Sequence, residues 1–208
     1  MNTAATLSGS GSTTARSVFV KIAALVVVVI AAFGILRATV SPTDEAGAER
    51  SAPTFTLVDS NGAQFSSTAL SGKVWVASFF FTSCDSVCPM VIGKLAGLFE
   101  NAPKQIHFVS FSIDPTNDDP AALAKYAQKF DADTRRWHFL TGTQDQLRAV
   151  VSEGFQVAMP ETKEELDRHS LRLVLVDQSG KIRGYFNSSE AEELARLKEV
   201  LEVYRGAI

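Results

Sequence analysis

Cysteine is scarce in this chain, with two residues among 208. Two cysteines are too few for the several disulfides that hold small secreted domains together, and too few for an iron–sulfur cluster. The sequence also lacks a basic patch, an aromatic ladder and an internal repeat, so nucleic acid is not an expected partner. With 20 basic and 23 acidic side chains, the formal net charge is −3.

One long apolar run lies near the N-terminus. Residues 18–36 carry a single charge, Lys21, whose amine can snorkel to the interface, and the run is long enough for a membrane helix. A cleaved signal peptide is the alternative, but the only small-x-small site downstream is Ala-Gly-Ala at 46–48, well beyond the run. We therefore expect an uncleaved anchor, with a disordered tail before it (1–17) and a linker after it (37–52).

The charges on the two sides of this run indicate an orientation. Arg16 and Lys21 lie at its N-terminal side, whereas Asp44, Glu45 and Glu49 follow it, together with Arg37 and Arg50, which reduce the difference. Because basic residues favour the cytoplasmic side of a membrane helix, we expect the globular domain on the non-cytoplasmic side.

The remainder of the chain alternates predicted strands with predicted helices. Apolar strands are expected at 74–81, 106–113, 137–140 and 171–176, with helices at about 89–100, 120–130 and 143–153 and a closing helix that ends near 204. Asn61-Gly62 predicts an early hairpin, Asp119 is the expected N-cap before Pro120, and Ser188 or Ser189 should cap the closing helix. This pattern predicts an α/β thioredoxin-like fold, a central mixed sheet flanked by helices.

Both cysteines lie between the predicted central strand and the helix that follows it, in VWVASFFFTSCDSVCPM (74–90). Pro89 suits the first turn of that helix, whose N–H groups and dipole lower the pKa of a nearby thiol. Three residues separate Cys84 from Cys88, one more than in the usual thioredoxin-type dithiol, so both thiolates can point at one external atom. Such a soft pair suits Cu(I) or Zn(II), although an inert pair or a structural disulfide is the alternative.

His169 is the predicted third ligand, because in a thioredoxin-like fold the start of strand 171–176 lies beside the loop with the cysteines. Two thiolates and one imidazole fit Cu(I), or Cu(II) with a further weak ligand, whereas zinc normally takes four ligands. The other histidines, His107 and His138, lie in apolar strands and are interpreted as structural. Asp114, near the same rim, is a candidate hydrogen-bond partner for a ligand.

A proline is missing at this same position. Thioredoxin-like oxidoreductases generally have a cis-proline where this chain reads His169-Ser170-Leu171. Since that proline helps to dock substrate disulfides, its absence counts against a general disulfide exchanger.

Three motifs, in order along the chain, resemble those of the Sco/SenC family. The segment FTSCDSVCP (81–89) is similar to the signature F-T-x-C-x-x-x-C-P, SIDPTND (112–118) matches S-x-D-P-x-x-D, and DRHS (167–170) resembles the D-H-S region. The resemblance covers roughly residues 52–205. One departure is Arg168, which separates the Asp and the His of the last motif.

The resemblance implies a membrane-anchored copper chaperone rather than an enzyme. It implies that Cys84, Cys88 and His169 bind Cu(I) or Cu(II) and deliver it to the binuclear copper site of cytochrome c oxidase. The expected partners are the copper-receiving subunit of the oxidase, other copper chaperones and thiol reductants. The implied location is the inner (cytoplasmic) membrane, with the copper-binding domain (53–208) on the periplasmic side.

Two other functions would use the same cysteines. A thiol-disulfide reductase would use Cys84 and Cys88 as a redox-active pair to keep the cysteines of the oxidase copper site reduced, without needing His169. A peroxide-reducing, peroxiredoxin-like enzyme would need a Thr and an Arg arranged around a reactive Cys, and Thr82 alone is thin support.

Overall fold

The computed structural model of the protein describes residues 50–84, 87–159 and 171–206. The predicted tail (1–17), the predicted membrane span (18–36) and most of the predicted linker lie outside the described residues. Within the described ranges, no helix is both long and apolar enough to cross a bilayer.

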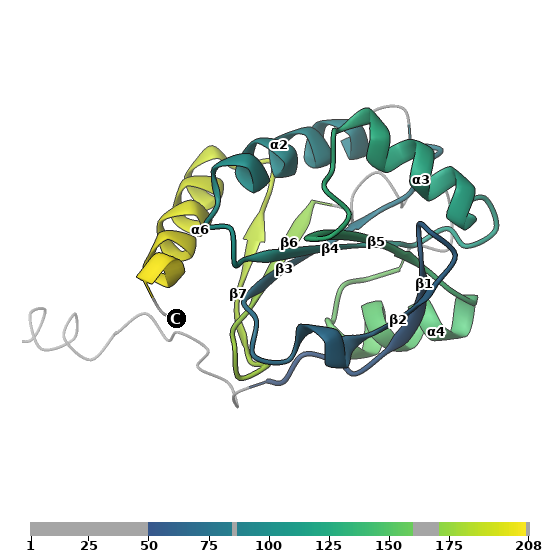
Figure 1. Cartoon of the computed structure of the whole chain (residues 1–208), viewed down its shortest axis with the longest axis horizontal. Helices are drawn as coiled ribbons and strands as arrows, with labels where there is room; N and C mark the ends of the chain where they lie inside the picture. The colour runs from purple at the N-terminus through teal and green to yellow at the C-terminus, as the bar shows by residue number, and fades with distance from the viewer. Residues whose placement is uncertain (1–49, 85–86, 160–170, 207–208) are drawn as a thin grey trace, which may run out of the picture. The chain divides into compact units, whose positions relative to one another are not determined.

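A mixed sheet of seven strands forms the centre of the described part (Figure 1). The strand order is β2-β1-β5-β4-β3-β6-β7, in which β3, β4 and β5 are parallel and the outer strands pair antiparallel. The strands are β1 (Thr56–Asp59), β2 (Gln64–Ser66), β3 (Trp75–Phe80), β4 (His107–Ser112), β5 (Trp137–Thr141), β6 (Arg172–Val176) and β7 (Ile182–Asn187). The predicted α/β architecture with a central mixed sheet is confirmed.

Helices lie on both faces of this sheet. Figure 1 shows α2 and α3 on one face and α4 on the other. The helices are η1 (Ser67–Leu70), α2 (Val87–Asn101), α3 (Pro120–Lys129), α4 (Gln144–Arg148), the π-helical turn η2 (Ala149–Gly154), α6 (Ala191–Val203) and η3 (Tyr204–Gly206). The single helix that the sequence predicts at 143–153 is therefore a short α-helix that continues as a π-helical turn.

The strand β3 is buried along its whole length, as its apolar run predicts. Its neighbouring side chains point to opposite faces of the sheet. Phe80 stacks on Tyr126 of α3, with ring centroids 5.0 Å apart. Phe79 packs edge-to-face against Phe155, the residue that follows η2, with ring centroids 5.6 Å apart. Because both faces are fixed by aromatic packing, the end of β3 is a rigid point from which the loop with Cys84 begins.

Local sequence signals place several of the chain's turns and helix starts. The predicted hairpin forms between β1 and β2, where Gly62 has a φ of 79° and the Asp59 carboxylate accepts from two turn N–H groups. Asp119 caps α3 by accepting a hydrogen bond from the N–H of Ala122 at 2.7 Å. Both features were predicted from the residue types alone.

The start of α6 differs from the prediction that Ser188 or Ser189 caps it. The helix begins at Ala191, and its N-cap, Glu190, makes no side-chain capping bond. The reason is local, because Asn187 Oδ1 accepts from both the N–H and the hydroxyl of Ser189. This Asx turn holds Ser189 outside the helix, whose first turn begins two residues later.

Residues 50–52, which the sequence places in the linker, are bonded to the turn between β6 and β7. The N–H of Ala52 donates to the carbonyl of Gly180 at 2.8 Å, and the N–H of Ile182 donates to the carbonyl of Arg50 at 2.8 Å. Ser51 forms an antiparallel bridge with Lys181. The ordered pairing therefore begins before the predicted boundary at 53.

The caps of α3 and α6 give a matched pair of substitutions. Asp119→Ala removes the acceptor of the Ala122 N–H, which has no partner within the helix. We therefore expect the free energy of unfolding to fall by about 1 kcal/mol. Glu190→Ala at the start of α6 removes no capping bond, only an exposed hydrogen bond from Asn187 Nδ2, and should lower this free energy much less. Urea unfolding of both variants measures this, and an equal loss in the two would contradict the assignment.

Candidate metal centre

The two cysteines lie at the start of α2 and both are buried. The N–H of Cys88 donates to the sulfur of Cys84, with an N···S distance of 3.2 Å. Cys84 thus accepts one of the N–H groups that a helix start leaves without an intrahelical partner. The structure confirms the predicted position of both thiols at a helix start.

The predicted third ligand, His169, lies outside the described residues. The strand that follows it in sequence, β6, begins at Arg172 and runs antiparallel to β3. In their register Leu173 pairs with Ser78, so the start of β6 lies beside the end of β3 that leads to Cys84. Within the described ranges, no three His, Cys, Asp or Glu side chains gather into a metal-binding cluster.

A buried carboxylate, that of Asp118, holds the loop between β3 and α2. It accepts hydrogen bonds from the N–H of Thr82 at 3.1 Å, from the hydroxyl of Thr82, and from the hydroxyl of Ser112 at the end of β4. Burial raises the pKa of Asp118, and the bonds from Ser112 and Thr82 oppose that rise. The clamp ties the residue two positions before Cys84 to the neighbouring strand.

Asp114, the carboxylate that the sequence suggested as a partner of a ligand, has a lesser part. It is more exposed than Asp118, and it accepts a hydrogen bond from Asn117 Nδ2 at 2.8 Å. Its contact with the loop is a long one, of 3.5 Å from Ser83 Oγ. Asp118 is therefore the acidic side chain that positions the dithiol loop. In the sequence, Asp118 is the last residue of the motif S-x-D-P-x-x-D, but an Asp at this position is equally typical of a turn.

The hydroxyl of Thr82 is engaged in the same clamp. It donates to Asp118 Oδ1. A peroxide-reducing site would need this hydroxyl directed at the reactive sulfur, so the structure gives no support to that function.

His107 and His138 lie far from the cysteines along the strands. His107 pairs with Trp75 at the first position of β3, whereas Cys84 follows the last position. The two imidazoles stack on each other, with centroids 6.0 Å apart and an interplanar angle of 5°. This position agrees with the structural role that the sequence predicted for both.

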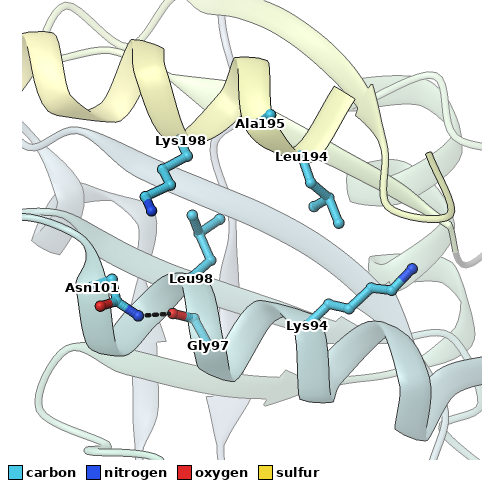
Figure 2. Close-up of a pocket in the computed structure, with 7 residues that line it drawn as sticks. All are labelled: Lys94, Gly97, Leu98, Asn101, Leu194, Ala195 and Lys198. Atoms are coloured by element: carbon cyan, nitrogen blue, oxygen red, sulfur yellow. Dashed lines mark hydrogen bonds between the residues drawn. The ribbon is translucent and has the colours of Figure 1, made fainter. Parts of the chain in front are cut away.

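A hollow of about 240 Å³ lies between α2 and α6 (Figure 2). It is lined by Lys94, Gly97, Leu98, Asn101, Leu194, Ala195 and Lys198. A second hollow, of about 280 Å³, lies around Trp75 and the turn that contains Gly180. Neither includes a cysteine, so the candidate metal centre is defined by its sulfurs and the loop that holds them and not by a cavity.

The fold and the loop together define a class of protein, a thioredoxin-like domain whose two cysteines, three residues apart, follow the central strand. The particular family follows from comparison: the model of the SCO1/SenC family matches residues 43–203, and this chain belongs to that family. One relative, a SCO1 protein homolog of Bacillus subtilis, is 31% identical over 142 residues, which cover 65% of this chain and 73% of the relative.

Solved structures share the fold. A SCO1/SenC family lipoprotein from Bacillus anthracis aligns with a TM-score of 0.68 and 30% identity over 75% of this chain and 95% of that one. BsSco is described as a member of the Sco family of cytochrome c oxidase assembly proteins with a disulfide switch. It aligns with a TM-score of 0.65 and 26% identity, over 76% of this chain and 95% of that one. Arabidopsis thaliana ScoI with copper bound aligns with a TM-score of 0.62 and 22% identity, over 74% of this chain and 99% of that one. This comparison shows a similarity of fold.

The stacked histidines predict a pH dependence of stability. Burial, with the nearby charges of Lys73, His138 and Arg136, lowers the pKa of His107 from 6.5 to about 4. Between these two pH values the unfolded chain binds more protons than the folded one. The free energy of unfolding should therefore increase as the pH rises from 4 to 6.5, and this gain should be lost as the pH is lowered again. Urea unfolding at pH 5 and pH 7.5 measures this, and His107→Gln should have the smaller difference. An equal difference in both proteins would contradict the assignment.

Proposed function

We propose that this protein is a membrane-anchored copper chaperone for cytochrome c oxidase. It binds one copper ion through Cys84, Cys88 and His169 and passes the ion, by exchange of ligands, to the binuclear copper site of the oxidase. The observation that carries the proposal is the pair of buried sulfurs at one helix start, linked by the bond from Cys88 N–H to Cys84 Sγ.

The chemistry of the donors favours copper as the cargo. Thiolates are soft ligands, and two of them with an imidazole give the low coordination number that suits Cu(I) better than zinc. The hydrogen bonds of Asp118 hold Thr82, at the start of the loop that carries the sulfurs, so this end of the loop needs little ordering on binding. Family membership supports the same cargo, since a structure of the same fold is described with copper bound.

Release of the ion is coupled to protons. Each thiol must lose its proton before it binds the metal, so copper uptake releases protons and acid favours loss of the ion. A partner whose own thiolates and imidazoles offer more ligands can take the ion without free copper being formed. The protein therefore needs no turnover chemistry of its own.

The partner and the location are part of the proposal. The copper-receiving subunit of the oxidase is the proposed acceptor, and the description of BsSco as a member of a family of cytochrome c oxidase assembly proteins supports it. Residues 18–36 would anchor the chain in the inner (cytoplasmic) membrane, with residues 53–208 on the periplasmic side.

A second candidate is a thiol-disulfide reductase that keeps the cysteines of the oxidase copper site reduced. The disulfide switch named for BsSco favours it, as does the adjacency of Cys84 and Cys88. One thiolate would attack the partner's disulfide to give a mixed disulfide, and the second sulfur would displace the partner's thiol. The two electrons pass to the partner's cysteines, which become thiols, and this protein is left with a Cys84–Cys88 disulfide that a thiol reductant must reduce again.

Replacement of His169 separates the two functions. In the reduced full-length chain, His169→Ala should weaken Cu(I) binding by more than about tenfold. The reason is that removal of a metal ligand lowers the affinity more than removal of a side chain that only hydrogen-bonds to a ligand. It should leave the rate of disulfide reduction nearly unchanged. Cu(I) titration against a competing chelator and a disulfide-reduction assay measure the two effects.

The controls replace the two cysteines and a second histidine. Cys84→Ser and Cys88→Ser should each abolish both activities, whereas His138→Gln, at the far end of the strands, should abolish neither. Full copper affinity in His169→Ala would remove the third ligand from the proposal and favour the reductase.

A further inference from the structure

The hollow between α2 and α6 is apolar in the middle and basic at its ends. Its lining comes from one face of each helix, at the spacing of three and four residues that brings helical side chains together. Figure 2 shows Leu98 of α2 and Leu194 of α6 reaching into the space between the helices. The ammonium groups of Lys94 and Lys198 lie towards its two ends.

The charges that line this hollow are all of one sign. Its lining includes two lysines and no acidic side chain, although the chain as a whole is acidic. The ammonium of Lys94 donates to the carbonyl of Ser188 at 2.9 Å, which holds it at the rim without neutralising its charge. Glu202, one turn beyond Lys198, is bonded to Arg205 instead. In the described part of the chain, neither lysine forms a salt bridge, so carboxylates from another molecule would complement the two ends.

Gly97 leaves a space in this hollow that the chain does not fill. It lies within α2, where glycine is one of the least favourable residues. A Cβ at this position would meet no atom within 4 Å, apart from its chain neighbours and the backbone of its own helix. Packing inside the described fold therefore does not require glycine here, whereas a side chain seated between Leu98 and Leu194 from outside would.

The size of the hollow indicates which kind of molecule it accepts. Its volume of about 240 Å³ is below the roughly 300 to 1,000 Å³ of pockets that enclose small-molecule ligands. A pocket for a single anchoring side chain, apolar inside and polar at the rim, is typical of protein–protein interfaces. The occupant that fits is a segment of another protein with an apolar side chain between carboxylates.

The hollow lies on the helix that begins at the dithiol. Cys88 is the second residue of α2, and Lys94 follows it by six residues, which is about 9 Å along a helix axis. Between them Met90 is 44% exposed, an adaptable apolar side chain next to the sulfurs. A protein anchored in the hollow would thus have its adjoining surface within reach of the dithiol.

We propose that the hollow between α2 and α6 is the docking site of the protein that receives the copper ion, which inserts an apolar side chain flanked by carboxylates. That the docked protein receives copper rests on the proposed function, whereas the docking itself needs no metal. The lysines steer the acidic partner to the hollow, and the apolar anchor holds it there.

The test titrates the metal-free full-length chain with the metal-free copper-receiving subunit of the oxidase and measures their affinity by calorimetry. Lys198→Glu should weaken binding by roughly five- to tenfold, because it places a like charge opposite the partner's carboxylate. An increase in salt from about 0.05 M to about 0.5 M should weaken the wild-type complex more than that of the variant.

A second variant fills the hollow without damage to the fold. Gly97→Leu should weaken binding by more than about tenfold, since its side chain occupies the place of the anchor. Its urea midpoint should not fall, because leucine is a better helix former than glycine and a Cβ is accommodated there.

Two matched controls make the same chemical changes outside the hollow. Gly93→Leu lies one turn earlier on α2, where a Cβ also meets no atom within 4 Å, but Gly93 does not line the hollow. Lys125→Glu reverses an exposed charge on α3. Both should bind the subunit with the affinity of the wild type.

Equal affinities for the wild type, Lys198→Glu and Gly97→Leu overturn the proposal, as does a wild-type chain that does not bind the subunit. A dimer of the full-length chain in sedimentation, lost in Gly97→Leu while binding of the subunit is unchanged, would assign the hollow to a second copy and also overturn it. Binding that depends on the hollow, but without passage of Cu(I) to the subunit, would refute the proposed function alone.

Discussion

The carboxylate of Asp118 binds the N–H and hydroxyl of Thr82 and the hydroxyl of Ser112, and the geometry of the dithiol loop depends on this clamp. A buried carboxylate is costly unless donors surround it, so the charge fixes the groups that solvate it. Thr82 is thereby held at the end of β3 and tied to the end of β4. The loop leaves the sheet from a fixed point, and Cys84 follows two residues later.

From that fixed point the start of α2 organises the sulfurs. The bond from Cys88 N–H to Cys84 Sγ makes one thiol part of the helix end, and the other occupies the first turn of the helix. Aromatic packing on both faces of β3 holds the strand end, and Tyr126 contributes to that packing from α3. The fold itself thus places the two sulfurs together at one helix start.

Much of this could be predicted from the sequence, since apolar periodicity locates the strands and residue types such as Asp119 and Asn61-Gly62 place helix starts and turns. The dithiol loop was predictable because a buried run, two cysteines and Pro89 are adjacent in sequence. Asp118 was not, because an Asp in a turn usually faces solvent and only the packed fold shows it buried. The start of α6 was mispredicted because Asn187 captures Ser189.

X-ray absorption of the full-length chain loaded with one equivalent of Cu(I) tests the central claim most directly, since it counts the atoms around the metal. The account predicts two sulfur scatterers, from Cys84 and Cys88, and one imidazole nitrogen, which should vanish from the spectrum of His169→Ala. A copper ion with a single sulfur neighbour, or an imidazole signal that persists in His169→Ala, would contradict it.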